Sequence, residues 1–313
     1  MKVITSGYAS LDRIFKLSNS LKLGETSLIL NDDNWTPLFG GCSPNIAYNL
    51  AKLGVKTYPI MRVGNDFESS GYRDYLLSSG LSLDYVSKID CDVTPFCFLF
   101  EDSTREHTTV FYTGSQHPKH YSPIDEKCFK GATYGVITVG DPKENMEFLQ
   151  LCKKHNVKIA FGMRKDLNSF PDELLKAALS ESTVLFMNSI ECDFIEKHFN
   201  LNSINDLYKN SKAEIIVVTQ GKGGSRFSTK DKQEFVHVPA ICTNVVDSAG
   251  AGDAFMSGFI YGLLNNENVL RCAQMGTLLS SLVIQAKGCT TNTPNVADFL
   301  KQLEKYFTRG INA

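Results

Sequence analysis

The second half of the chain alternates short apolar segments with longer segments of helical character, and this alternation limits the possible folds more than any other feature. The expected strands are 134–139, 157–161, 183–187 and 214–219, and the expected helices lie near 143–155, 171–180, 189–199 and 203–210. Strands that alternate with helices predict a parallel sheet with helices on both faces. The strands are apolar on both sides, as buried parallel strands are. We therefore expect an α/β fold with a doubly wound, mostly parallel sheet.

The first half of the chain fits one side of the same sheet, with two irregular regions inserted. Expected strands lie at 2–8 and 55–63, and expected helices at 44–53 and 66–79. Residues from about 13–38 and 95–113 lack helical periodicity and alternate short apolar stretches, such as 27–30, with polar turns. We expect these two regions to form one small β-sheet that acts as a lid. Because no linker or internal repeat interrupts the pattern, we predict a single domain over residues 1–313.

Composition and charge exclude several classes of protein. Of the 313 residues, 42% are hydrophobic and 21% charged, which is typical of a globular chain, and a formal net charge of −2 gives no attraction to nucleic acid or anionic membranes. No apolar run has transmembrane length, and the first residues are typical of a strand rather than a signal peptide. Nine cysteines without a C-x-x-C pair suit reduced thiols. We expect a cytoplasmic protein with no nucleic-acid and no membrane partner.

The stretch from Val245 to Phe255 carries the clearest chemical signal. An apolar lead-in is followed by Gly250 and Gly252 and then by a helix-like run. Glycines let the backbone approach a ligand closely, and the unpaired N–H groups at the positive end of a helix dipole suit a phosphate. Asp253 lies in the same turn, where it would repel a phosphate but could accept a proton from an attacking hydroxyl. The spacing alone fits equally well an ordinary glycine loop with Asp253 as a partner of the helix dipole.

Several other classes do not fit this spacing. The G-x-G-x-x-G pattern of a nicotinamide-dependent dehydrogenase is not present, because Phe255 stands at the third glycine position and the early Gly40-Gly41 pair does not match either. No G-x-x-x-x-G-K-[ST] loop occurs, and the H-R-D and D-F-G signatures of protein kinases are absent. A ligand-binding protein without activity is disfavoured, although not excluded, by the intact Asp253. The close histidine pair, His117 and His120, flanks a proline, so we expect a surface loop there rather than a metal site.

Three further motifs accompany this stretch along the chain. They are Gly40-Gly41-Cys42-Ser43-Pro44-Asn45-Ile46-Ala47, Asn188-Ser189-Ile190-Glu191 and Val218-Thr219-Gln220-Gly221-Lys222-Gly223-Gly224. Together with the residues from Asp247 to Asp253, they resemble the G-G-x-x-x-N-x-A, N-x-x-E, T-x-G-x-x-G and D-T-x-G-A-G-D signatures of the ribokinase-like (PfkB-type) carbohydrate kinases. Four motifs in family order, spread over nearly the whole chain, make the resemblance specific, although none would be specific alone.

The resemblance implies an ATP-dependent kinase with a ribokinase-like fold and a lid. Asp253 would be the general base beside the phosphoryl cradle of Gly250, Ala251 and Gly252. The implied substrate-binding residues are Asp12, Gly40, Gly41 and Asn45. The implied nucleotide-binding residues are Asn188, Thr219, Gly221, Gly224 and Thr277, although the family usually has Asn or His near the position of Thr277. Mg²⁺ would bridge the phosphates with Glu191 acting through water, and a monovalent cation such as K⁺ could bind near Asp247.

Simpler interpretations remain open at several of these positions. Asp12 follows the first strand and could be a turn residue. Ser43 is the expected N-cap of the helix from residue 44, so Asn45 could be a solvated residue of the first turn rather than a ligand. Asn188 and Glu191, three residues apart, fit a helix-capping pair as well as a binding site.

Short stretches favour a nucleoside, adenosine-like, as the substrate over a free sugar such as ribose or fructose. The stretches that resemble the nucleoside kinase branch are 111–114, 140–142 and 275–276. Residues 161–163 depart from that branch, which has an Asp-Pro pair after the phenylalanine. The lid aromatics Phe98, Phe111 and Tyr112 could stack on a base or form the core of the lid. A homodimer through the exposed lid edge and a monomer fit the sequence equally well.

Overall fold

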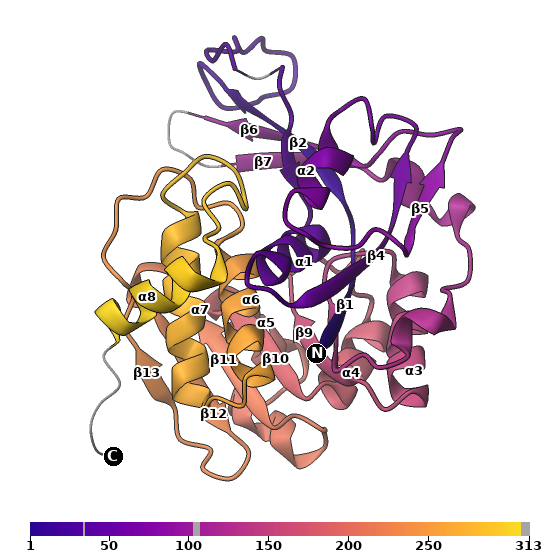
Figure 1. The fold of residues 1–313 in the computed structure, drawn as a ribbon. Helices are drawn as coiled ribbons and strands as arrows, with labels where there is room; N and C mark the ends of the chain where they lie inside the picture. Colours follow the sequence, from indigo (N-terminus) through magenta and orange to yellow (C-terminus); the bar gives the residue numbers. More distant parts are fainter. Residues whose placement is uncertain (34, 103–106, 308–313) are drawn as a thin grey trace.

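The fold is built around one large sheet, which the computed structural model describes together with its helices over residues 1–33, 35–102 and 107–307 (Figure 1). Within these described residues its strands are, in spatial order, β13 (Val236–Val238), β12 (Ser225–Thr229), β11 (Ile215–Thr219), β10 (Val184–Asn188), β9 (Lys158–Gly162), β8 (Tyr134–Ile137), β1 (Lys2–Ser6), β4 (Lys56–Gly64) and β5 (Val86–Ile89). Neighbours from β11 to β5 pair in parallel, whereas β12 and β13 add antiparallel strands at one edge. The predicted mostly parallel sheet is confirmed.

Helices cover both faces of this sheet. One face is packed by α1 (Cys42–Lys52), α6 (Ala251–Leu264), α7 (Val269–Val283) and α8 (Val296–Tyr306), and the other by α3 (Pro142–Lys154), α4 (Asp172–Glu181) and α5 (Ser189–His198). Val3 and Val136 belong to the first core, while their chain neighbours Ile4 and Ile137 belong to the second. Successive side chains of a strand point to opposite faces, so continuous apolar strands supply both cores. No helix in the described part of the chain combines the length and the apolar character needed to cross a membrane.

A smaller sheet lies at the top of Figure 1, above the large one. Its strands in the described residues are, in spatial order, β3 (Leu38–Gly40), β2 (Ser10–Lys16), β6 (Phe96–Glu101) and β7 (His107–Tyr112). They come from the two regions expected to form a small sheet, although 103–106 lie outside the described residues. The strand expected at 27–30 is wrong: Ile29 makes only an isolated bridge to Leu17. Leu28 and Leu30 stay exposed there, so no second layer stabilises a strand.

The start of α1 also differs from the prediction. The helix begins at Cys42, because Gly41 adopts a φ of 99° as its N-cap and turns the chain before Ser43 is reached. Ser43 is therefore not the cap, and its hydroxyl lies 2.8 Å from that of Thr5. This early start places Cys42 and Asn45 one turn apart on the same side of the helix.

Two other predicted helices are shorter or tighter than expected. The helix expected over 66–79 is reduced to α2 (Tyr72–Leu77), because Gly71 takes the left-handed conformation at a φ of 81°. The helix expected over 203–210 is a 3₁₀ helix, Ile204–Lys209, which the side chain of Ser203 caps. Both segments lie in connections between the strands of the large sheet, where capping and glycine conformation decide the local structure.

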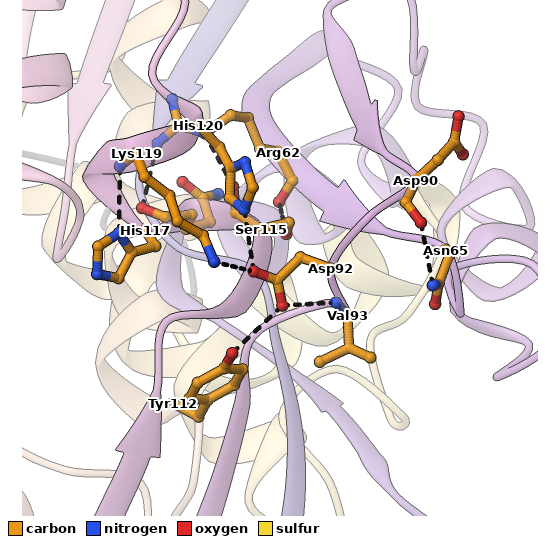
Figure 2. Close-up of polar contacts among 11 residues, drawn as sticks. Arg62, Asn65, Asp90, Asp92, Val93, Tyr112, Ser115, His117, Lys119 and His120 are labelled. Atoms are coloured by element: carbon orange, nitrogen blue, oxygen red, sulfur yellow. Dashed lines mark hydrogen bonds and ion pairs between the residues drawn. The ribbon is translucent and has the colours of Figure 1, made fainter.

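A polar cluster around Asp92 connects the small sheet to the body of the protein, as Figure 2 shows. The Asp92 carboxylate accepts a hydrogen bond of 3.3 Å from the hydroxyl of Tyr112, the last residue of β7, and lies 2.9 Å from Nε2 of His120 and 3.1 Å from Nζ of Lys119. The hydrogen bond from His120, and after it the contact with Lys119, lower the pKa of Asp92. The expected surface loop is confirmed only in part, because His117 is exposed but His120 is partly buried in this cluster.

Helices α6 and α7 approach each other closely, and we predict that Gly258→Ala destabilises the protein. A Cβ at Gly258 would lie 2.5 Å from the carbonyl oxygen of Met275 and 2.9 Å from the Cα of Gly276. Because these are backbone atoms, the helices must separate, at a cost of about 1–3 kcal/mol. Urea unfolding followed by circular dichroism measures the loss. An unchanged midpoint would show that the contact is not tight.

Candidate active site

A cavity of about 400 Å³ opens at the carboxyl ends of the central strands, where open α/β sheets bind their ligands. Its walls come from the residues that follow β8 and β9, from the ends of β10 and β11, and from the start of α6. The predicted site residues that line it are Asn188, Glu191, Thr219, Gly250, Ala251, Gly252 and Asp253. Motifs that are far apart in the sequence therefore meet in one place.

The turn before α6 needs a glycine because its backbone is in the left-handed conformation. Gly250 takes a φ of 75°, and a Cβ there would lie 2.6 Å from the carbonyl oxygen of Cys289. The carboxylate of Asp247 holds the turn in place, because it accepts hydrogen bonds of 2.9 Å from the N–H groups of Ala249 and Gly288. A Cβ on Gly252, by contrast, would meet nothing within 4 Å. The backbone at Gly252 therefore faces open space beside the positive end of the α6 dipole.

Asp253 lies in the first turn of α6 and lines the cavity rather than the apolar core. Its Oδ2 accepts a hydrogen bond of 2.8 Å from Nδ2 of Asn45. Burial raises the pKa of Asp253, and the contacts with Asn45, Arg164 and Cys42 partly offset that rise. Asn45 is buried and holds the carboxylate, so the interpretation of Asn45 as a solvated residue is wrong.

Asp12 and the glycine pair form a second part of the site next to Asp253. Asp12 lies on β2, and Gly40 is close to it on β3, where a Cβ would lie 2.2 Å from Oδ2 of Asp12. Burial raises the pKa of Asp12 to about 6, the hydrogen bond from Ser10 lowers it, and the charge of Asp253 adds to the rise. The charges of Asp12 and Asp253 therefore act on each other. Asp12, Gly40 and Gly41 are not among the residues that line the main cavity.

The other end of the cavity has the residues expected to bind a nucleotide. Asn188 and Glu191 form a complete capping box at the start of α5, with hydrogen bonds of 2.9 Å and 2.8 Å between each side chain and the other's backbone N–H. Burial raises the pKa of Glu191, which also lines the cavity. The capping interpretation is confirmed.

A smaller cavity of about 150 Å³ adjoins the first, and Thr219, Ala251, Gly252 and Phe255 line both. Gly221, Gly224 and Thr277 line only the smaller one. Thr277 is 7% exposed, and its hydroxyl has no hydrogen-bond partner among the residues that the structure describes. Buried hydroxyls are rarely left unpaired, so this one suits a polar ligand such as a nucleotide base.

Two residues of the cavity wall were not predicted from the sequence. Arg164 follows β9 and lines the cavity together with Asp253, and Cys42, at the start of α1, lines it too, with its Sγ 3.9 Å from Nη1 of Arg164. A signal for Arg164 existed, since a cation directly after an apolar strand falls at the ligand-binding edge of the sheet. Cys42 gave no signal, because the first motif leaves its position free. An arginine next to an anion cradle suits charged oxygens.

The stretches that favoured a nucleoside have structural roles in this fold. A Cβ on Gly114 would lie 2.3 Å from the carbonyl oxygen of Val93, and one on Gly276 would lie 2.7 Å from that of Phe255. Asp141 caps α3 by accepting a hydrogen bond from Glu144. These stretches are therefore explained by packing, without a substrate. Among the lid aromatics, Phe98 makes edge-on or tilted ring contacts with Phe15, Phe96 and Phe100, Phe111 contacts Tyr8, and Tyr112 contacts Phe96.

No group of three or more His, Cys, Asp or Glu side chains within 1–33, 35–102 and 107–307 could hold a metal ion. Mg²⁺ in nucleotide sites is held by substrate phosphates, water and one or two carboxylates rather than by a protein cage. The buried carboxylate of Glu191 on the cavity wall fits that mode of binding.

Comparison with known proteins identifies the family. A family model described as "pfkB family carbohydrate kinase" matches residues 2–296. The chain belongs to the pfkB family. The resemblance found in the sequence is thereby confirmed, and the protein is a phosphotransferase that has a hydroxyl group as acceptor.

This pfkB-family kinase is 29% identical over 306 residues to the nucleoside kinase of Methanocaldococcus jannaschii, with 97% of both chains covered. A crystal structure of that nucleoside kinase matches with a TM-score of 0.86 and 28% identity, covering 97% of this chain and 98% of the other. The 5-dehydro-2-deoxygluconokinase of Geobacillus kaustophilus is 27% identical over 299 residues, with 87% and 86% covered. A structure of Arabidopsis thaliana ribokinase complexed with ribose and ATP matches with a TM-score of 0.82 at 22% identity, covering 96% and 98% of the two chains, which shows the fold alone.

We predict that Gly252→Ala leaves the pfkB-family kinase stable but inactivates it. A Cβ there meets no protein atom within 4 Å, so the folded protein has room for it. The same Cβ would occupy the space beside the unpaired N–H groups, where a phosphate would lie. Melting temperature and phosphoryl transfer are measured on the same sample. Gly258→Ala is the matched control in the same helix, because it should lower the melting temperature whereas Gly252→Ala should not.

Proposed function

We propose that this pfkB-family kinase transfers the γ-phosphoryl group of ATP to the primary hydroxyl of a nucleoside. The observation that carries the proposal is the position of Asp253, which lies at the start of α6, lines the cavity and is held by Asn45. The similarity to a nucleoside kinase over 97% of the chain supports a nucleoside, adenosine-like, as the acceptor. The alternative acceptor, a free sugar such as ribose or fructose, is tested in the same experiment.

In this proposal Asp253 accepts the proton of the attacking hydroxyl. The hydrogen bond from Asn45 fixes one carboxylate oxygen and leaves the other for the substrate. Burial raises the pKa of Asp253, which makes its carboxylate a stronger base than an exposed aspartate. The transition state of phosphoryl transfer is loose, and its negative charge is spread over the oxygens of the transferring group. Positioning and charge stabilisation therefore supply most of the catalysis. The N–H groups of Gly250 and Gly252 and the guanidinium of Arg164 stabilise that charge, while the N–H of Ala251 donates to the carbonyl oxygen of Ser248 at 3.3 Å.

We place the nucleotide along the two adjoining cavities. The base lies in the smaller one against Gly221, Gly224 and the unpaired hydroxyl of Thr277, and the phosphates lie toward Asn188, Thr219 and the start of α6. Mg²⁺ supplies charge neutralisation at the β- and γ-phosphates when it is bound, with Glu191 acting through water. A K⁺ site near Asp247 stays a prediction. Each carboxylate oxygen of Asp247 already accepts a hydrogen bond from a backbone N–H, so these oxygens are not free of other partners.

The acceptor lies between the body and the small sheet. Asp12 accepts hydrogen bonds from its hydroxyl groups, while Gly40 and Gly41 let it approach the backbone closely. The small sheet acts as a lid that excludes water, which competes as an acceptor. We propose that residues 1–313 work as one kinase domain with this lid, in the cytoplasm, where the nine free thiols stay reduced.

The first experiment measures ATP consumption with a panel of nucleosides and free sugars. We expect transfer to nucleosides, and transfer to ribose or fructose alone would contradict the nucleoside assignment. Asp253→Asn should still bind ATP, because the cradle and the base pocket are intact, but should lose about 10²–10⁴-fold in kcat. Isothermal titration with ATP confirms that the variant is folded. Substantial residual turnover by this variant would refute the assignment of Asp253 as base.

We also propose that the chain forms a homodimer through the lid edge. Strand β7 is an open edge of the small sheet, and Val110 on it is 52% exposed. A lysine on an edge strand opposes pairing with a second sheet. We expect light scattering to show a dimer for the native protein and a monomer for Val110→Lys. Val236→Lys, which changes an exposed valine on β13 at the edge of the large sheet, should leave the dimer intact. A monomeric native protein contradicts the proposal.

A further inference from the structure

The first turn of α1 places a thiol next to two charged groups of the cavity, Arg164 and Asp253. Sγ of Cys42 lies 3.9 Å from Nη1 of Arg164. Cys42 also precedes Asn45 by three residues on the same helix, and Asn45 bonds Asp253, so Cys42 and Asn45 face Asp253 from the same side. Cys42, Arg164 and Asp253 all line the cavity.

The two charges do not meet. Arg164 and Asp253 both belong to the described part of the chain, and they form no ion pair within 4.0 Å. Each nevertheless acts on the thiol: burial first, and then the charge of Asp253, raises the pKa of Cys42, while Arg164 lowers it. The Cys42 thiol interacts with both Arg164 and Asp253 and carries no charge of its own, so it acts as a spacer that separates the two charged side chains.

We propose that Cys42 is a positioning residue that keeps the Arg164 guanidinium from closing onto the Asp253 carboxylate. The inference rests on the proposed function, in which Asp253 needs a free oxygen for the hydroxyl and Arg164 needs free N–H groups for the phosphoryl group. A direct ion pair would occupy both. A thiol fits this place because it is small, weakly polar and uncharged at neutral pH.

Removal of the spacer has a defined effect on the pH dependence. The groups that face Asp253 are Asn45 and Cys42 from α1, Arg164 after β9, Asp12 from β2 and Cys289 after α7. Arg164 is the cation among them. If it closes onto the carboxylate, the ionised form of Asp253 is favoured and its pKa falls. The acid limb of kcat/KM, which reports the free enzyme, then moves to lower pH.

The kinetic experiment compares three variants of the full-length protein with the acceptor that the panel identifies. In Cys42→Ala the acid limb should move down by about one pH unit and kcat/KM should fall about tenfold, because the pair must open before reaction. Cys42→Ser, which keeps a small uncharged group, should stay within about threefold of the native value. In Cys42→Ala combined with Arg164→Gln the downward shift should disappear. A limb that stays in place or moves up in Cys42→Ala overturns the proposal.

Ser43→Ala is the matched control for damage to the same helical turn. Its hydroxyl contacts Thr5 and not the cavity, so the melting temperature should fall without any movement of the acid limb. If Ser43→Ala moved the limb as Cys42→Ala does, the effect would be general loosening of α1, and the spacer role would be wrong.

A second experiment needs no turnover and so separates this inference from the proposed function. Iodoacetamide alkylation of Cys42, followed by mass spectrometry of its peptide, reports how the neighbouring charges act on the thiol. Asp253→Asn removes a charge that disfavours the thiolate and should speed alkylation several-fold, whereas Arg164→Gln should slow it. Equal rates in all three proteins would show that the thiol does not lie between the two groups. Inactivity of the native protein with every acceptor, together with the expected alkylation rates, would refute the proposed function and leave the arrangement of the three groups supported.

Discussion

The left-handed turn at Gly250 is the constraint on which the candidate site depends. Packing against Cys289 leaves no room for a Cβ at Gly250, and the Asp247 carboxylate fixes the same turn through two backbone N–H groups. With the turn fixed, α6 starts at the edge of the sheet beside the cavity, and Asp253 follows within the first turn. The helix itself is held by its tight contact with α7. One helix therefore serves both stability and chemistry: it packs tightly against α7 at Gly258 and borders open space at Gly252.

Much of the fold could be predicted, because continuous apolar strands are distinctive. Neighbouring residues such as Val3 and Ile4 point to opposite faces of the sheet, and each belongs to a different hydrophobic core. Such consecutive apolar residues are typical of a sheet that is buried on both faces. Helix boundaries were less predictable, since they depend on the conformation of single glycines. Gly41 and Gly71 both adopt positive φ, and a sequence does not reveal which glycines do so. The apolar residues at 27–30 suggested a strand but stay largely exposed, with no partner sheet to cover them.

The candidate site was predictable as a set of motifs, and its internal geometry was not. Strand ends meet at one edge of a parallel sheet, so motifs after successive strands converge. The contact between Asn45 and Asp253 joins residues 208 positions apart, and it depends on how α1 and α6 pack together. Cys42 meets Arg164 because the start of α1 also lies beside the segment that follows β9. Such contacts follow from the tertiary arrangement of helices, and no spacing within one motif encodes them.

The register of the small sheet has a mechanical consequence. Ser10 pairs with Gly40, Leu11 with Phe96, and Phe96 with Tyr112, so all four strands join the body at the same end. The opposite end projects away from the large sheet (Figure 1). The small sheet is thus held to the body at two places: by the contacts of Asp92 at the end that joins the body, and by the ion pair between Lys287 and Asp33, which lies in the segment that joins β2 to β3. Any rotation of the small sheet as a lid has to break that ion pair.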